Sequence, residues 1–186
     1  MQERTVTDLA VASGMTVAEL HAIPDDGMRR ELIDGELFVT PAPMPGHQAA
    51  AAKLHAALLP VIGERLMLFA PVDVFIDDRS CVQPDLVVYS EEQRGQLSAD
   101  VAPPKGLAPE VAVEISSPST RRIDLIHKRR LFERAGVREY WFVDRKAGIV
   151  DVYVFATDEL RSASGEQHIP SDVLVPDVTV AALLAW

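Results

Sequence analysis

The chain has 186 residues, and its 28 acidic side chains outnumber its 18 basic ones, which gives a formal net charge of −10. That charge argues against a protein that coats nucleic acid through an overall basic surface. Hydrophobic residues make up 48% of the chain, which excludes extensive disorder, and a single cysteine, Cys81, excludes an internal disulfide framework. We therefore expect an intracellular, cytoplasmic protein with its own hydrophobic core.

Length and apolar patterning together predict the domain organisation. The first ten residues lack the apolar centre of a signal peptide, and Lys53 and His55 interrupt the most apolar stretch, residues 49–63. We expect no contact with a membrane. Residues 1–15 are predicted to be a flexible N-terminal segment, and residues 16–186 a single domain.

The first predicted elements are a short helix, a hairpin and a longer helix. Thr16 and Glu19 have the spacing of a capping box, and the helix that they begin must end before Pro24. Two apolar runs then flank Asp34-Gly35, which predicts a β-hairpin. The Ala- and Leu-rich residues 47–64 predict a helix with a kink or an end near Pro60.

The rest of the chain alternates between strands and helices. VDVFID, DLVVY and EVAVEIS predict strands, with a long loop at residues 90–108 that could border a cleft. A helix is predicted from Arg121 to Ala135, ending at Gly136. A C-terminal hairpin (YWFVD and IVDVYVF), a loop or edge strand at 157–168 and a helical turn at 180–186 follow. This order predicts an α/β fold with a mixed central sheet flanked by helices.

Two carboxylates interrupt strands that are otherwise apolar. In EVAVEIS the period-two alternation places Glu114 on the face opposite Val113 and Ile115. Asp85 follows Pro84 and begins the run LVVY. Burying such acids costs several kcal/mol unless they are paired or bound to a cation. Taken singly, Asp85 could equally be a turn or strand cap, whereas Glu114 is harder to explain in that way.

A lysine lies in the apolar stripe of the 121–135 helix. With residues about 100° apart around the axis, Leu125, Leu131, Phe132 and Ala135 share a face, and Lys128 projects from its middle. One interpretation is a surface pair with Asp124 at i,i+4 spacing. The position within the stripe favours a buried ion pair or a functional group.

These features occur within strings that resemble a known family. ELIDGEL, VQPDLVVY, VEISSPST, RRIDLIHKRRLFERAGVREYWFVD and VDVYVF resemble the Uma-two family of restriction endonucleases, a bacterial branch of the PD-(D/E)xK nuclease superfamily. The resemblance covers nearly the whole chain beyond about Thr16. It implies a restriction-endonuclease-like fold with N-terminal and C-terminal hairpins, and metal-dependent hydrolysis of phosphodiester bonds in DNA.

The resemblance also assigns roles to individual residues. Asp85 and Glu114 would be catalytic acids that hold Mg²⁺ or Mn²⁺, with the Ile115 carbonyl as a further ligand. The family pattern places a lysine two residues after the second acid, but this chain has Ser116 there. The resemblance therefore maps the catalytic lysine to Lys128.

A further catalytic candidate, Glu31, corresponds to a glutamate that many nucleases of this fold use near the start of the domain. It could equally be a solvated residue of the first hairpin.

Four residues are candidates for substrate binding: His47, Ser117, Thr120 and Arg121. His47 could contact substrate or merely begin a helix, and we favour the latter. Ser116, Ser117, Ser119 and Thr120 are typical of side chains that satisfy backbone donors at a helix start, although such donors also bind phosphate. Arg121 belongs to a basic segment that could form a local patch: Arg121, Arg122, Lys128, Arg129, Arg130, Arg134 and Arg138.

Two functions from different classes are consistent with these residues. The first is a Mg²⁺-dependent endonuclease that acts on DNA, and it is favoured by the set of Asp85, Glu114 and Lys128. The second is a non-cleaving nucleic-acid or protein-binding module, favoured by the acidic net charge and by Ser116. A homodimer is expected only by analogy, because cutting two strands usually takes two active sites.

Overall fold

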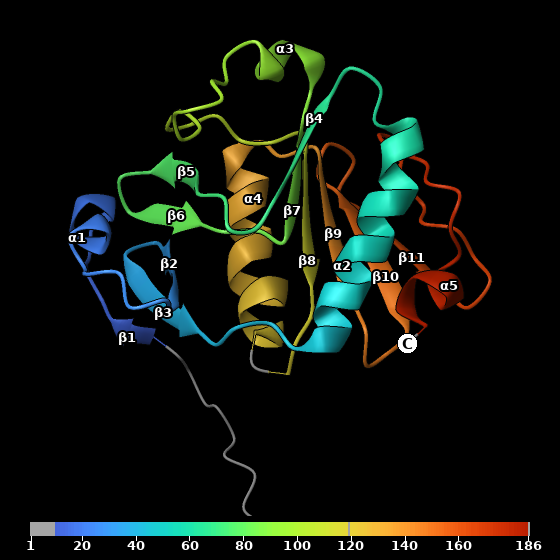
Figure 1. Cartoon of the computed structure of the whole chain (residues 1–186), viewed down its shortest axis with the longest axis horizontal. Helices are drawn as coiled ribbons and strands as arrows, with labels where there is room; N and C mark the ends of the chain where they lie inside the picture. The colour runs from blue at the N-terminus through green and yellow to red at the C-terminus, as the bar shows by residue number, and fades with distance from the viewer. Residues whose placement is uncertain (1–9, 119, 186) are drawn as a thin grey trace, which may run out of the picture.

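The computed structural model describes residues 10–118 and 120–185, which form two β-sheets with helices packed on them (Figure 1). The smaller sheet has the strand order β1-β3-β2-β6-β5 and the larger has the order β11-β10-β9-β8-β7-β4. The strands of the smaller sheet are β1 (Ala10–Ala12), β2 (Arg29–Ile33), β3 (Glu36–Thr40), β5 (Val74–Asp77) and β6 (Ser80–Val82). Those of the larger sheet are β4 (Leu66–Phe69), β7 (Leu86–Tyr89), β8 (Val111–Ile115), β9 (Glu139–Asp144), β10 (Ile149–Val154) and β11 (Glu159–Ser164).

Helices pack on both faces of the larger sheet, and α1 (Val17–His21) packs on the smaller sheet. The other helices are α2 (Pro45–Leu58), the 3-10 turn η1 (Leu59–Val61), α3 (Glu91–Arg94), the π-helix η2 (Ile123–Lys128), α4 (Arg129–Ala135) and α5 (Val180–Leu184). Leu54 of α2 and Leu183 of α5 pack on one face of the sheet. Phe132 of α4 packs on the other face, together with Val82 of the smaller sheet. Figure 1 shows η2 and α4 in this position, between the two sheets.

The larger sheet is mixed, as the sequence predicts. Strands β8 and β9 run parallel, whereas β7 and β8 run antiparallel. The N-terminal hairpin β2–β3 turns at Asp34 and Gly35, which have φ angles of 53° and 82°. Positive φ at both positions is what a tight hairpin turn of this kind requires. The C-terminal hairpin β9–β10 is also present, so the predicted α/β fold class is confirmed.

Helix boundaries follow the local sequence signals closely. Thr16 and Glu19 form the reciprocal capping box of α1, and Gly136 ends α4 in the left-handed conformation. Helix α2 begins two residues before the predicted position and ends at Leu58, where the chain tightens into the turn that contains Pro60. Proline lacks the N–H that an α-helix would need in its interior, which explains the change.

Several features differ from the expectations. Strands β4 and β6 were not expected, because a run of three or four residues carries little periodicity. Part of the segment expected to be flexible forms β1, which pairs with β3, and the expectation for residues 1–9 lies outside the described residues. No helix in the described part of the chain is long and apolar enough to cross a membrane.

The segment at residues 90–108 is held in place more firmly than an open loop. It begins with α3, and the Gln93 side chain donates to the Ala108 carbonyl at 2.7 Å. The backbone N–H of Gly106 donates to the Phe75 carbonyl at 2.8 Å. No residue of this segment is among those that line the pocket beside Asp85, so its expected place beside a cleft stays a prediction.

Candidate active site

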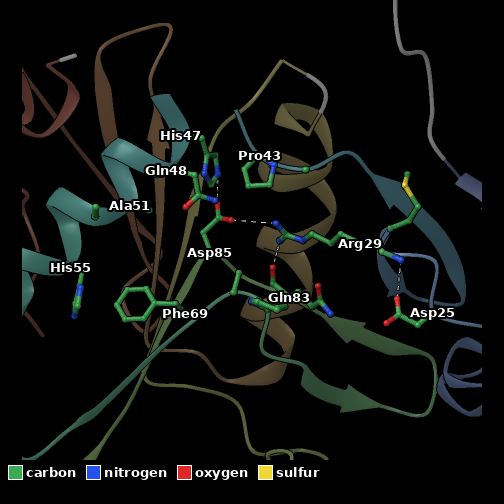
Figure 2. A pocket seen from close by; sticks show the side chains of 16 residues that line it. Asp25, Arg29, Pro43, His47, Gln48, Ala51, His55, Phe69, Gln83 and Asp85 are labelled. Atoms are coloured by element: carbon green, nitrogen blue, oxygen red, sulfur yellow. Dashed lines mark hydrogen bonds and ion pairs between the residues drawn. The ribbon is translucent and has the colours of Figure 1, made fainter. Parts of the chain in front are cut away.

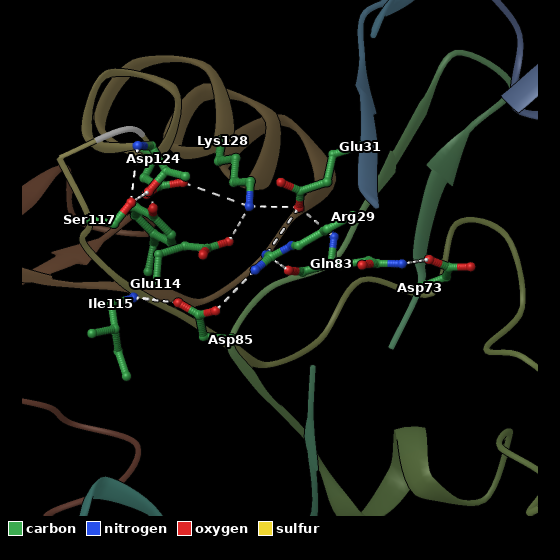
Figure 3. A network of polar contacts seen from close by, with 12 residues as sticks. Arg29, Glu31, Asp73, Gln83, Asp85, Glu114, Ile115, Ser117, Asp124 and Lys128 are labelled. Atoms are coloured by element: carbon green, nitrogen blue, oxygen red, sulfur yellow. Dashed lines mark hydrogen bonds and ion pairs between the residues drawn. The ribbon is translucent and has the colours of Figure 1, made fainter. Parts of the chain in front are cut away.

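Asp85 and Glu114 lie across from each other on adjacent strands. The antiparallel register pairs Leu86 with Val113, which places Asp85, just before β7, opposite Glu114 in β8. Both side chains are on the face of the sheet that packs against η2 and α4 (Figure 3). The Ile115 N–H donates to Asp85 Oδ2 at 2.8 Å. The two acids are therefore held on one face by the sheet itself.

Lys128 lies at the centre of a buried group of carboxylates. Its Nζ is 2.7 Å from Glu31 Oε1, 2.7 Å from Glu114 Oε1 and 3.7 Å from Asp124 Oδ1. Only 1% of the Lys128 side chain is exposed. Because Glu31 belongs to β2 and Glu114 to β8, the ammonium joins the two sheets. The interpretation of Lys128 as a surface partner of Asp124 is wrong, and Glu31 is likewise a buried residue.

A π-helical turn presents Lys128 and Asp124 to this cluster. Six residues, Ile123–Lys128, adopt the wider turn, and the Arg129 N–H donates to the Asp124 carbonyl. The Tyr140 hydroxyl donates to the same carbonyl at 3.0 Å, so the widened turn is tied to the sheet. Turns of this kind are rare and are frequent at functional sites. The expected 100° spacing of the helix therefore does not hold through this segment.

The carboxylates of the cluster differ in acidity. Burial raises the pKa of Glu114 well above its usual range despite the attraction of Lys128, and Asp124, Asp85 and Glu31 raise it further. Burial also raises the pKa of Asp124, from 3.8 to about 6. For Glu31, burial is outweighed by the charges of Lys128 and Arg29, which hold its pKa below the ordinary value. Glu114 is thus the acid on which a proton is most easily retained.

Arg29 is a member of the cluster that sequence reasoning missed. Its guanidinium is 3.3 Å from Asp85 Oδ1 and 3.5 Å from Glu31 Oε1, and it donates to the Gln83 carbonyl. Gln83 in turn donates its backbone N–H to Glu31 Oε1 at 2.6 Å. The signal in the sequence was the alternation that places Arg29 and Glu31 on the same face of β2.

His47 is placed against the first acid. It is buried in the first turn of α2, and its Nε2 is 2.9 Å from Asp85 Oδ2. Burial alone would raise the pKa of Asp85, but the contacts with His47, Arg29 and the Ile115 N–H lower it below the ordinary value. The interpretation that His47 merely begins a helix therefore omits its main contact.

The other substrate-binding candidates lie at the edge of the cluster or beyond it. Ser117 Oγ and Thr120 Oγ1 are 2.9 Å apart, and the Thr120 N–H donates to Ser117 Oγ, as in a helix-start motif. Thr120 also bonds the side chain of Asp124. Arg121 instead pairs with Asp144, 3.0 Å from its Nε. Ser119 lies outside the described residues.

Several members of the basic segment that could form a local patch are paired with acids or buried. Three of its arginines form ion pairs with acids: Arg121 with Asp144, Arg134 with Asp34, and Arg138 with Glu110. Lys128 is buried, and Arg129 lies over the ring of Tyr153 at 5.2 Å. Much of the local positive charge is therefore neutralised within the protein.

A pocket of about 660 Å³ leads to the cluster from the side of α2 (Figure 2). Asp85 and Arg29 line it, whereas Glu31, Glu114, Asp124 and Lys128 lie behind them. The polar and aromatic side chains of its wall include Arg29, His47, Gln48, His55, Phe69 and Gln83. A ligand in this pocket would thus meet Asp85 and Arg29 first.

The donor set of the cluster fits a divalent cation. Four buried carboxylates, Glu31, Asp85, Glu114 and Asp124, face two cations, Lys128 and Arg29. If all are ionised, two negative charges remain without a counter-charge, in surroundings where unpaired charge is costly. Carboxylate oxygens are the ligands that Mg²⁺ and Mn²⁺ prefer. Asp85 and Glu114, which lie opposite each other on adjacent strands, remain with the Ile115 carbonyl the predicted ligands of such an ion.

A second group of possible ligands lies outside the cluster. Among the described residues, His21, Asp73 and Cys81 are the one set of three or more histidine, cysteine or acidic side chains whose ligand atoms all lie within 4.8 Å of each other.

The two-sheet architecture is that of restriction-endonuclease-like nucleases. A family model named Uma2, described as "Putative restriction endonuclease", matches residues 17–183, and the chain belongs to this family. Family membership supports a nuclease-like function. No curated protein matches the chain.

A solved structure is similar to this one over nearly its whole length. It is described as a "putative nuclease belonging to DUF820" from Anabaena variabilis ATCC 29413. The TM-score is 0.79 at 18% sequence identity, and the match covers 92% of this chain and 98% of that one. At this identity the likeness concerns the fold.

Proposed function

We propose that the protein is a metal-dependent endonuclease that hydrolyses phosphodiester bonds in DNA. The observation that carries the proposal is the excess of two buried carboxylates over cations around Lys128, which a divalent ion would balance. Asp85, Glu114 and the Ile115 carbonyl would hold Mg²⁺ or Mn²⁺. When bound, such an ion lowers the pKa of a coordinated water and neutralises charge that develops on phosphate.

The protein's own residues would divide the remaining work. Lys128 carries a fixed positive charge, since Glu114, Glu31 and Asp124 outweigh the effect of burial and raise its pKa. It would stabilise negative charge at the reacting phosphate. Glu31 would orient the Lys128 ammonium through their 2.7 Å contact. Among the described residues of the cluster, Arg29 is the cation that lines the pocket, so it would meet the phosphate first.

The pocket supports a substrate with an unpaired base next to the reactive phosphate. The ring centroids of His55 and Phe69 are 4.4 Å apart, and both rings form part of the pocket wall, where a base can stack. Binding along the backbone of a long DNA duplex would rely on basic side chains. Arg121, Arg134 and Arg138 are already paired with acids of the protein. We therefore propose that the protein cuts single-stranded DNA at least as well as duplex DNA.

Metal-dependent melting and cleavage together test this function. Mg²⁺ or Mn²⁺ should raise the melting temperature of the native protein, because it relieves repulsion among the buried carboxylates. The shift should vanish in Glu114→Ala, while the exposed control Asp177→Asn keeps it. Single-stranded and duplex DNA should be cut with either metal and left intact by Asp85→Ala. An equal melting shift in Glu114→Ala would contradict the metal site.

The second candidate function is a non-cleaving nucleic-acid or protein-binding module. It is favoured by the paired arginines and by the net charge of −10. Metal-dependent stabilisation without cleavage of any DNA form would support this candidate. A homodimer is proposed only for double-strand cutting, where sedimentation of the protein with duplex DNA would test it.

A further inference from the structure

Three side chains of different chemistry converge between α1 and the β5–β6 hairpin. His21 ends α1, Asp73 precedes β5, and Cys81 lies in the middle of β6. Their ligand atoms all lie within 4.8 Å of one another, and His21 Nε2 is 3.9 Å from Asp73 Oδ2. Ligand atoms around a tetrahedral zinc ion lie roughly 3.3–3.8 Å apart, given bonds of 2.0–2.3 Å. A small inward movement would complete such a site.

We propose that His21, Asp73 and Cys81 form a second metal site, which binds a zinc-like transition-metal ion. The combination of imidazole, carboxylate and thiolate suits zinc and cobalt, whereas Mg²⁺ prefers oxygen ligands alone. On binding, the Cys81 thiol forms the sulfur–metal bond and releases its proton to solvent. A water molecule would take the fourth position, as at other three-ligand zinc sites.

The exposure of these three side chains and the hydrogen bonds that hold them both favour metal binding. The side chains of His21 and Asp73 are 48% and 33% exposed, so an ion can enter from solvent, and Cys81 forms the buried floor. Asp73 Oδ1 accepts a hydrogen bond from Gln83 Nε2 at 2.9 Å, while Oδ2 faces His21. Metal-binding carboxylates are commonly held by such second contacts. The ring of His21 also packs edge-on against Phe75, the residue paired with Cys81 across the hairpin.

Gln83 connects this group to the carboxylate cluster. Its side chain bonds Asp73, its N–H bonds Glu31, and its carbonyl accepts from Arg29 (Figure 3). An ion held by Asp73 would therefore restrict the residue that positions Glu31 and Arg29. The inferred role is to fasten α1 and the β5–β6 hairpin beside the proposed active site. The metal site itself does not depend on nuclease activity.

Titration of the metal-free full-length protein with Co²⁺ tests the site directly. A cobalt–thiolate bond gives a charge-transfer absorption in the near ultraviolet, and Cys81 is the sole cysteine of the chain. The native protein should develop this band at one equivalent, lose it on addition of Zn²⁺ and keep it in excess Mg²⁺. The band should be absent in Cys81→Ser.

Variants of the other two ligands keep the test independent of the fold around the buried thiol. His21→Gln and Asp73→Asn should each weaken Co²⁺ binding at least tenfold, and Gln83→Leu should weaken it about 10–100-fold as an outer-shell contact. The matched control is His168→Gln, because His168 is also 3.9 Å from an aspartate, Asp177, and should leave binding unchanged. Absence of the band in the native protein would overturn the proposal. So would a band unaffected by His21→Gln and Asp73→Asn, because the thiol would then bind cobalt alone.

Discussion

Lys128 and Arg134 lie in one continuous helical segment, formed by η2 and α4, yet their ion pairs differ in environment. Lys128 approaches Glu31 and Glu114 at 2.7 Å and is 1% exposed. Arg134 approaches Asp34 at 2.6 Å, but these two side chains are 52% and 59% exposed. The distances are nearly equal, so burial rather than geometry separates the two cases.

Burial determines how much each of these ion pairs can contribute to stability. An exposed pair contributes about 0–1 kcal/mol to stability. A buried group of ions is often no more stable than apolar side chains of similar size, although removing one member costs about 3–5 kcal/mol. Retaining four acids and two cations inside this small protein therefore favours a functional role for the Lys128 cluster.

The largest expected effect follows from Lys128→Met, which keeps the length and the apolar packing of the side chain. Cleavage should fall by about 100–1,000-fold, as on loss of a preorganised donor. Unfolding free energy should fall by about 3–5 kcal/mol, since Glu31 and Glu114 lose their counter-charge. Single-turnover cleavage and urea unfolding measure the two effects.

A second variant separates loss of catalysis from loss of folding. Lys128→Met combined with Glu31→Gln removes one positive and one negative charge, so it should regain part of the lost stability. Its cleavage rate should stay low. Native-like cleavage by either variant, in an assay where Asp85→Ala is inactive, would refute the role of Lys128.

An intermediate effect is expected from the pH dependence of Asp124. Its pKa is raised by burial from 3.8 to about 6, so the native state binds its proton more tightly than the unfolded state. The stability that this group contributes is present below about pH 4 and is lost as the pH rises through 6.

Asp124→Asn should remove this dependence. Relative to the native protein, the variant should gain stability between pH 4 and pH 7, on the order of 1–3 kcal/mol. Urea unfolding in a chelating buffer at several pH values measures the difference. A constant difference between the two proteins across this range would show that Asp124 does not titrate there.

The smallest effect is expected on the exposed side of the same helix. Arg134→Met should change the unfolding free energy by less than about 1 kcal/mol, because the pair with Asp34 is solvated and screened. Cleavage of single-stranded DNA should be unchanged. A loss of cleavage comparable to that of Lys128→Met would remove the contrast between the two pairs.

Local sequence patterns predicted which side chains of a single helix or strand point toward the site. Alternation in β8 placed Glu114 on the opposite face from Val113, and the turn at Asp34-Gly35 predicted the hairpin that carries Glu31. The apolar stripe of the helix predicted that Lys128 points inward. Each of these inferences needs only the period of one helix or strand.

Local patterns could not predict the contacts between segments that lie far apart in the sequence. His47 reaches Asp85 across 38 residues, and Arg29 reaches it across 56. Alternation places Arg29 on the same face as Glu31, but no local pattern identifies Asp85 as the partner of either Arg29 or His47, because tertiary packing brings these segments together. The ion pairs that neutralise Arg134 and Arg138 depend on tertiary structure in the same way.

The widened turn of η2 makes the length of this helix as important as its composition. Removing one residue from η2 would let the segment return to an ordinary α-helix with nearly the same direction for the Lys128 side chain, because the wider turn accommodates one extra residue. A substitution at the partly exposed Ile126 would not alter that register. A second deletion would meet no widened turn to absorb it, and Lys128 would rotate by about 100° away from Glu114. The segment can thus lose one residue, but not two, without moving the ammonium out of the carboxylate cluster.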